Sequence, residues 1–96
     1  MAEWEAEDNR LQLRNRVDDL RGRLAKQRKT VDYYLTAALP EADELQRNAL
    51  MLYEASETGM AELLQSLAAA RDIRKSYVEA VRDYNILIIE LELFTE

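Results

Sequence analysis

Ser56-Glu57-Thr58-Gly59 is the chain's only cluster of small, turn-competent residues. The 96 residues contain just two glycines and one proline. A β-rich domain needs many more turn residues, so helices are favoured on both sides of the cluster. The cluster therefore predicts one reversal, at residues 56–59, between two long helices.

After this turn, apolar residues recur at alternating steps of four and three, which is the heptad pattern of a coiled coil. Gly59 is placed to cap the helix, and Glu62 is placed to return its carboxylate to a free backbone N–H. We expect a helix over about 60–94, roughly 52 Å long at 1.5 Å per residue. The apolar positions form a seam with one polar member, Arg74: Leu63, Leu67, Ala70, Tyr77, Val81, Tyr84, Ile88 and Leu91.

The chain before the turn carries a second seam, in which Gln27 is the polar member. From Ala38 to Ala42 it takes two consecutive steps of four, a phase slip that locally unwinds a coiled coil. Pro40 lies inside the slip and disfavours helical angles at the residue before it. We expect a helix over about 3–55 with a kink near residue 40. The other seam positions are Leu13, Val17, Leu20, Leu24, Val31, Tyr34, Leu45, Ala49 and Leu52.

These patterns predict an all-α fold, in which residues 1–96 form one long antiparallel helical hairpin of coiled-coil type. The first helix is the longer one, so residues before about Arg21 are expected to have no partner within the chain. The uncovered seam residues Leu13, Val17 and Leu20 would then expose an apolar stripe. That stripe predicts self-association.

The net charge of −6 is spread unevenly, because residues 1–29 carry eight basic side chains against six acids. A nucleic-acid stripe is disfavoured, since Asp18 and Asp19 interrupt the basic stretch 10–29 and it lacks aromatic residues. No apolar run approaches the roughly 20 residues that span a bilayer. The N-terminus is acidic, unlike a signal peptide. We expect no nucleic-acid partner, no membrane insertion and, if the protein is exported, a mature fragment.

Residues that carry catalysis are scarce. The chain has no histidine and no cysteine, which removes the commonest general base, the thiol nucleophile and any disulfide. Ser56, Ser66 and Ser76 have no base partner at helical spacing. The sequence therefore predicts neither an enzyme nor a bound cofactor.

Two groups of residues carry side-chain atoms of the kind that bind metal ions. Glu41, Asp43 and Glu44 carry oxygen ligands for a hard cation, but acids are common in the first turn of a helix, here the one after Pro40. Met51 and Met60 flank the turn as soft thioethers, for which packing across the hairpin tip is the favoured role. We expect no metal site.

Three groups of motifs resemble one known family. They are Ala-Leu-Pro-Glu-Ala-Asp-Glu-Leu at 38–45; Tyr-Glu-Ala-Ser-Glu at 53–57 with Glu-Leu-Leu-Gln at 62–65; and Tyr-Val-Glu-Ala-Val-Arg-Asp-Tyr-Asn at 77–85 with Ile-Glu-Leu-Glu at 89–92. In order and spacing they are similar to the TolC-type outer-membrane efflux proteins. The heavy-metal branch, associated with cobalt, zinc, cadmium, copper or silver export, is the most similar. The resemblance covers about residues 11–96.

The resemblance implies a function in transport. The family is trimeric, with a β-barrel in the outer membrane and a long α-helical barrel in the periplasm. This chain looks like the helical part of the second of two pseudo-repeats, without the strands. It is thereby identified as a periplasmic part of a bacterial outer-membrane protein. A periplasmic adaptor and an inner-membrane pump are its implied partners in a tripartite system that exports cations or drugs.

The resemblance also implies a gate at the periplasmic tip. Acidic residues at the positions of Glu62 and Gln65 ring the family's closed entrance. A tyrosine at the position of Tyr53 helps to hold it shut, and a basic residue at that of Thr58 takes part. Here Gln65 replaces an acid and Thr58 is not basic, so one acidic ring is expected where relatives have two.

The adaptor-docking turn implied by the resemblance consists of Ser56, Glu57 and Gly59. Ser56 replaces the family's usual turn glycine, and Gly59 replaces its usual hydroxyl cap. Two other readings stay open. One is a free-standing coiled-coil interaction or scaffold module. The other is a periplasmic adaptor hairpin, which is disfavoured because the flanking lipoyl-like strands are missing.

Overall fold

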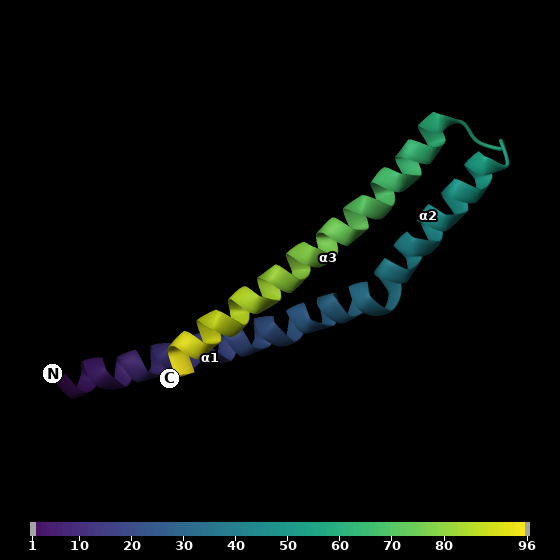
Figure 1. The fold of residues 1–96 in the computed structure, drawn as a ribbon. Helices are drawn as coiled ribbons and strands as arrows, with labels where there is room; N and C mark the ends of the chain where they lie inside the picture. Colours follow the sequence, from purple (N-terminus) through teal and green to yellow (C-terminus); the bar gives the residue numbers. More distant parts are fainter. Residues whose placement is uncertain (1, 96) are drawn as a thin grey trace.

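The structure, a computed structural model, describes the backbone of residues 2–95 and the side chains of residues 6–95. Within this range every residue outside 55–59 is helical, and there is no strand. The helices form an antiparallel hairpin with extents of 78 × 21 × 15 Å (Figure 1). The all-α hairpin predicted from the sequence is confirmed.

The first arm of the hairpin is continuous but changes helix type part-way. It consists of α1 (Ala2–Tyr33), the π-helix η1 (Tyr34–Ala38) and α2 (Leu39–Glu54). The second arm is the single helix α3 (Met60–Thr95). Figure 1 shows the two arms side by side, with the N-terminal end of α1 extending past the C-terminal end of α3.

The buried interior of the hairpin consists mostly of alanines, and all of its residues except Ala80 are predicted seam positions. Leu13, Leu45 and Leu52 are the only apolar seam positions that stay exposed; the others are buried or half-buried. Small side chains allow close approach of the two helices but remove little apolar area from water. The seam thus holds the two arms of the hairpin together, while most large apolar side chains remain outside it. The buried residues are Leu20, Ala38, Ala42, Ala49, Leu63, Ala70 and Ala80.

The kink is a π-helical segment that lies just before Pro40. The Leu39 N–H donates to the carbonyl of Tyr34, five residues back, instead of four. Pro40 has no N–H, and in a regular α-helix its ring would collide with the carbonyl of Thr36. The wider π turn relieves this collision and takes up the phase slip of the seam. Figure 1 shows the first arm bending between α1 and α2.

The bend changes how the two arms align. Gln27 Nε2 donates to the carbonyl of Ala80 at 3.0 Å, whereas a straight hairpin folded about residues 55–59 would place Ala80 opposite roughly residue 34. The first arm bows outward at the bend, so it uses more residues to cover the same length (Figure 1).

This alignment corrects one prediction. Residues before Arg21 were expected to lack a partner, yet Leu20 is fully buried, Val17 is half-buried and Arg16 reaches Glu90 at 3.4 Å. The expectation was wrong because it assumed a straight first arm. Of the seam residues expected to be uncovered, only Leu13 is exposed.

The loop between the arms caps both helices. The N–H of Ser56 donates to the Tyr53 carbonyl at 3.0 Å, and the N–H of Glu57 donates to the Leu52 carbonyl at 2.9 Å. Ser56 itself has a left-handed φ of 56°. These two bonds around one left-handed residue form a Schellman motif, whose central position is usually glycine.

The start of α3 is capped as predicted. The N–H of Gly59 donates to Glu62 Oε2 at 3.0 Å, and the Leu63 N–H donates to the Gly59 carbonyl at 3.2 Å. The reach of the Glu62 side chain back to the first residue of the cap is the glutamate half of a capping box. The turn therefore stops one helix and starts the next within five residues.

Candidate functional site

The structure places the predicted gate residues and the predicted docking turn at one end of the hairpin. Tyr53 lies in the last turn of α2 and is partly exposed, whereas Thr58 is half-buried in the loop. Glu62 and Gln65 are exposed one turn apart near the start of α3. Ser56, Glu57 and Gly59 form the loop itself. The sequence order alone brings these residues together, because the hairpin reverses at 55–59.

The carboxylate of Glu62 is already engaged within the tip. Its Oε2 accepts the Gly59 N–H, and it sits in the first turn of α3, where the helix dipole favours a negative charge. The side chain thus has a structural role that is complete within one chain. Its second carboxylate oxygen makes no hydrogen bond to the described residues.

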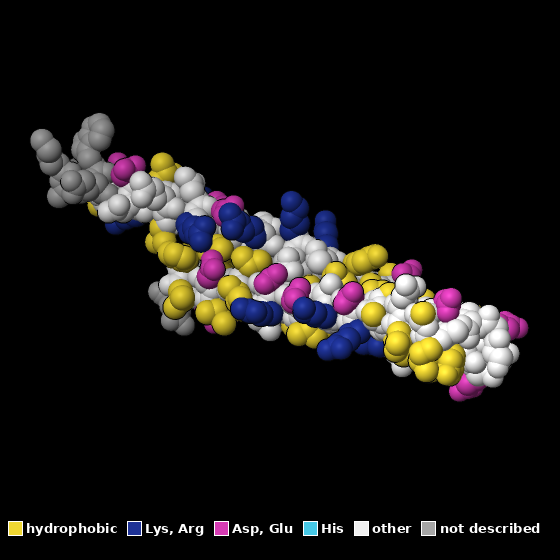
Figure 2. Space-filling view, turned by 90° about the horizontal axis from the view of Figure 1, so that it is seen from above, with side chains coloured by type: hydrophobic (Ala, Val, Ile, Leu, Met, Phe, Trp, Pro, Cys, Tyr) yellow, Lys and Arg dark blue, Asp and Glu magenta, His cyan; other side chains and the backbone are white. Residues whose placement is uncertain are grey.

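The tip surface is both acidic and apolar. Residues 48–70 contain Glu54, Glu57 and Glu62 but no lysine or arginine. Figure 2 shows hydrophobic side chains gathered near this end of the molecule. Such a surface favours an apolar partner that carries basic residues. The exposed large apolar residues of the tip are Leu50, Met51, Leu52, Tyr53, Met60 and Leu64.

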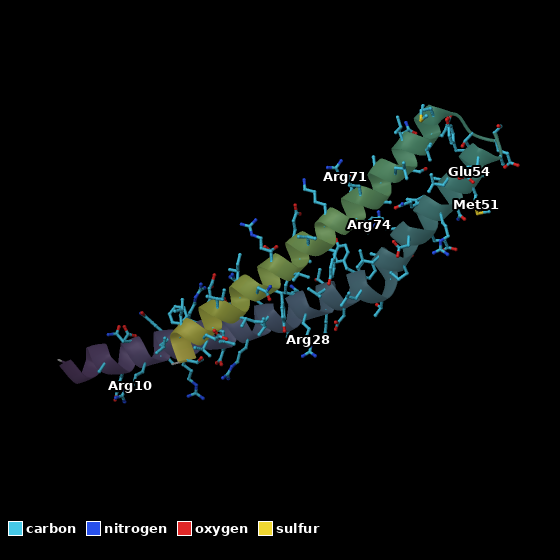
Figure 3. The ribbon with its side chains drawn as sticks, viewed as in Figure 1. Arg10, Arg28, Met51, Glu54, Arg71 and Arg74 are labelled. Carbon is cyan, nitrogen blue, oxygen red and sulfur yellow. The ribbon has the colours of Figure 1, made fainter. Side chains whose placement is uncertain are left out.

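The prediction that Met51 and Met60 pack across the tip is wrong. Their exposed fractions are 63% and 52%, and Met51 points away from α3 (Figure 3). The reason is the phase of the seam: Leu63 is the buried residue at this end, and both methionines lie beside the seam positions. Within the described residues, no group of three or more potential ligands is placed to hold a metal ion.

The polar seam residues have partners that the sequence did not identify. Arg74 reaches across to Asp43 of α2, with 2.8 Å between Nη2 and Oδ1. Figure 3 shows Arg74 on the side of α3 that faces α2, and Arg71 on the opposite side. Gln27 bonds the Ala80 carbonyl in the other half of the hairpin. A polar residue at a seam position signals such a cross-link, but its position does not reveal the partner.

Aromatic residues gather at the bend, which the sequence did not predict. The rings of Tyr34 and Tyr77 lie 6.3 Å apart across the hairpin, and Tyr33 meets Tyr34 edge-on at 5.7 Å. A shallow groove opens beside them, lined in part by Glu41 and Asp72. The tyrosines pack the two arms together where the π-helix spreads them.

Comparisons with known protein families, with curated proteins and with solved structures found no match. None of the described helices has both the length and the apolar character needed to cross a membrane.

Proposed function

We propose that the hairpin is a wall segment of a larger helical assembly, and that this assembly is the periplasmic duct of an outer-membrane efflux channel. Its work is structural: it packs against neighbouring helices and presents its tip to a periplasmic adaptor. No catalytic step is part of this function.

The observation that carries the proposal is the distribution of large apolar side chains outside the seam. A helix that is apolar beyond its one covered face needs further helices around it. Here such residues follow both arms and remain exposed in the single hairpin (Figure 2). They are Leu11, Tyr33, Leu35, Leu50, Met51, Tyr53, Met60, Leu64, Val78, Ile86, Ile89, Leu93 and Phe94.

The duct is favoured among helical assemblies by the resemblance of the sequence motifs. The motif at 53–57 and the one at 62–65 meet at the exposed tip, where the resemblance implies gating and adaptor docking. The tip's acidic, apolar surface suits a docking role. Adaptor and pump remain proposed partners, and a trimer is the proposed state of the intact channel.

Fractionation of the encoding bacterium tests this proposal. An antibody raised against the hairpin should detect a polypeptide in the outer-membrane fraction that is much longer than 11.2 kDa. Genes for an adaptor and a pump should lie beside its own. A soluble 11.2 kDa band with no such neighbours would refute the duct.

A free-standing interaction module is the second candidate, and one observation favours it. The end of the hairpin opposite the tip exposes the apolar side chains of Ile86, Ile89, Leu93 and Phe94, which suits contact with another helical chain.

A further inference from the structure

One flank of the hairpin carries a row of arginines at heptad spacing. Arg21 and Arg28 each directly follow a seam residue of α1, so they border one edge of the seam. Arg14 lies seven residues before them, and all three side chains are exposed. Because seven residues complete about two helical turns, the three arginines form a straight row with steps of roughly 10.5 Å.

No carboxylate of α3 faces this row. The hydrogen bond to the Ala80 carbonyl sets the alignment of the arms, and it places Asn85 and Val78 on the same edge, near Arg21 and Arg28. Among the described side chains, neither arginine contacts a carboxylate. The opposite edge of the seam differs, since an arginine of α1 there reaches an acid of α3 at 3.4 Å. The positive charge of the row is therefore not compensated within the hairpin.

The positive charge continues onto α3. Three exposed bases of α3 lie on the same side of the hairpin, at or beside the positions that follow its seam residues. Figure 2 shows Lys and Arg side chains in a row separate from the Asp and Glu side chains along the middle of the molecule. We call this surface, over residues 14–32 of α1 and 71–85 of α3, the basic flank. Its charged residues are the bases Arg14, Arg21, Arg28, Arg71, Lys75 and Arg82 and the acids Asp18 and Asp32.

Apolar side chains lie beside these bases and are incompletely covered. Val78, which lies among them, has an exposed fraction of 63%. Aliphatic residues bordered by cations match an amphipathic helix that carries acids beside its apolar stripe. Nucleic acid is a poorer match, because the residues of this flank include no aromatic ring on which a base stacks. The half-buried seam residues next to the basic flank are Val17, Leu24, Val31, Val81 and Ile88.

We propose that the basic flank binds an acidic amphipathic α-helix of another polypeptide. The apolar stripe of that helix covers the half-buried seam residues, and its acids, at steps of seven, pair with Arg21 and Arg28. A second copy of this chain fits less well. Its acids with that spacing are Asp83 and Glu90, and Glu90 is already paired with Arg16 of its own chain. The proposal rests on the part of the proposed function in which the hairpin packs against further helices, and it does not depend on export.

A synthetic helix tests the contact. The probe is a labelled peptide of about 28 residues, or four heptads, with leucine at the seam positions and glutamate at the flanking ones. Repulsion between its glutamates keeps it from pairing with itself at neutral pH. Fluorescence anisotropy should show saturable binding to the wild-type hairpin. A matched peptide with lysine in place of every glutamate should bind at least about tenfold more weakly. Absence of saturable binding, or equal affinity for the two peptides, would overturn the proposal.

Charge reversal locates the contact on the hairpin. Arg21→Glu together with Arg28→Glu should raise the Kd of the glutamate peptide by about tenfold or more, because two attractions become repulsions. Lys26→Glu together with Lys29→Glu is the matched control, with the same change in net charge at exposed positions of α1 outside the basic flank. This control should change the Kd by less than about twofold. Equal weakening by the two pairs would indicate attraction to a basic helix in general and would refute the proposal. All variants should keep the helical circular dichroism of wild type, since every altered side chain is exposed.

Two other occupants of the basic flank give different results. If a second copy of the chain binds there, sedimentation equilibrium without peptide should show an association that Arg21→Glu with Arg28→Glu abolishes. If nucleic acid binds there, a single-stranded DNA oligonucleotide should displace the glutamate peptide at equal concentration. Either result would overturn the proposal. Loss of peptide binding leaves the outer-membrane fractionation result unaffected, so the failure of this proposal is distinguishable from the failure of the duct.

Discussion

Ser56→Gly tests the helix stop at the tip. Ser56 has a φ of 56°, and it occupies the Schellman position that glycine usually fills. A left-handed conformation costs a residue with a Cβ about 1–2 kcal/mol. Glycine avoids that cost but gains roughly 0.5–1 kcal/mol of additional freedom in the unfolded chain. The net expectation is a stabilisation of about 0.5–1 kcal/mol, or roughly 2–8 °C in Tm for a domain of this size.

Thermal and urea unfolding, followed by circular dichroism at one fixed protein concentration, measures this change. The fixed concentration matters because association raises the apparent stability. Ser76→Gly is the matched control, since Ser76 lies in the interior of α3. There the same substitution should lose about 0.5 kcal/mol of helix propensity. If Ser56→Gly is destabilising, or matches Ser76→Gly, then Ser56 is not left-handed and the proposed turn geometry fails.

Three further changes test the caps and the seam by the same unfolding assay. Glu62→Ala should cost about 0.5–1 kcal/mol by removing the bond to the N-cap amide, whereas Glu79→Ala on the exposed face should cost almost nothing; equal losses would argue against the cap. Ala70→Leu should cost about 1–3 kcal/mol because Ala70 is fully buried between close helices, whereas Ala68→Leu, on the exposed face, should be neutral; tolerance at both would mean that the arms are not in close contact. Arg74→Leu should be neutral or stabilising, because the ion pair it removes is largely exposed and contributes less than about 1 kcal/mol; a large loss would show that this pair holds the arms together.

The main features of the hairpin follow from local patterns in the sequence. Only one cluster of residues is able to reverse the chain, and both seams keep heptad spacing apart from the slip at Ala38–Ala42, so the two arms and their turn follow directly. The capping bond between Gly59 and Glu62 was predictable for the same reason, because its partners are three residues apart. A phase slip beside Pro40 predicted the kink.

Long-range alignment was less predictable. The slip signals a bend, but not the amount by which the first arm bows. That bow sets Ala80, rather than a later residue of α3, opposite Gln27. Met51 and Met60 are exposed for a similar reason. Both residues flank the turn, but neither occupies a seam position that faces the other arm. The function does not follow from contacts within the hairpin, because in the proposed duct the tip residues act between chains.

In the proposed function, the outward apolar faces of the hairpin build the wall of an export duct. Measuring the content of cobalt, zinc, cadmium, copper and silver in cells of the organism that encodes the chain tests this duct. Deletion of the gene should raise the cellular content of at least one of these metals, and the wild-type gene should restore it. A gene with Leu64→Asp, which alters an exposed apolar position outside the seam, should fail to restore it. Equal metal contents in all four strains would contradict the claim.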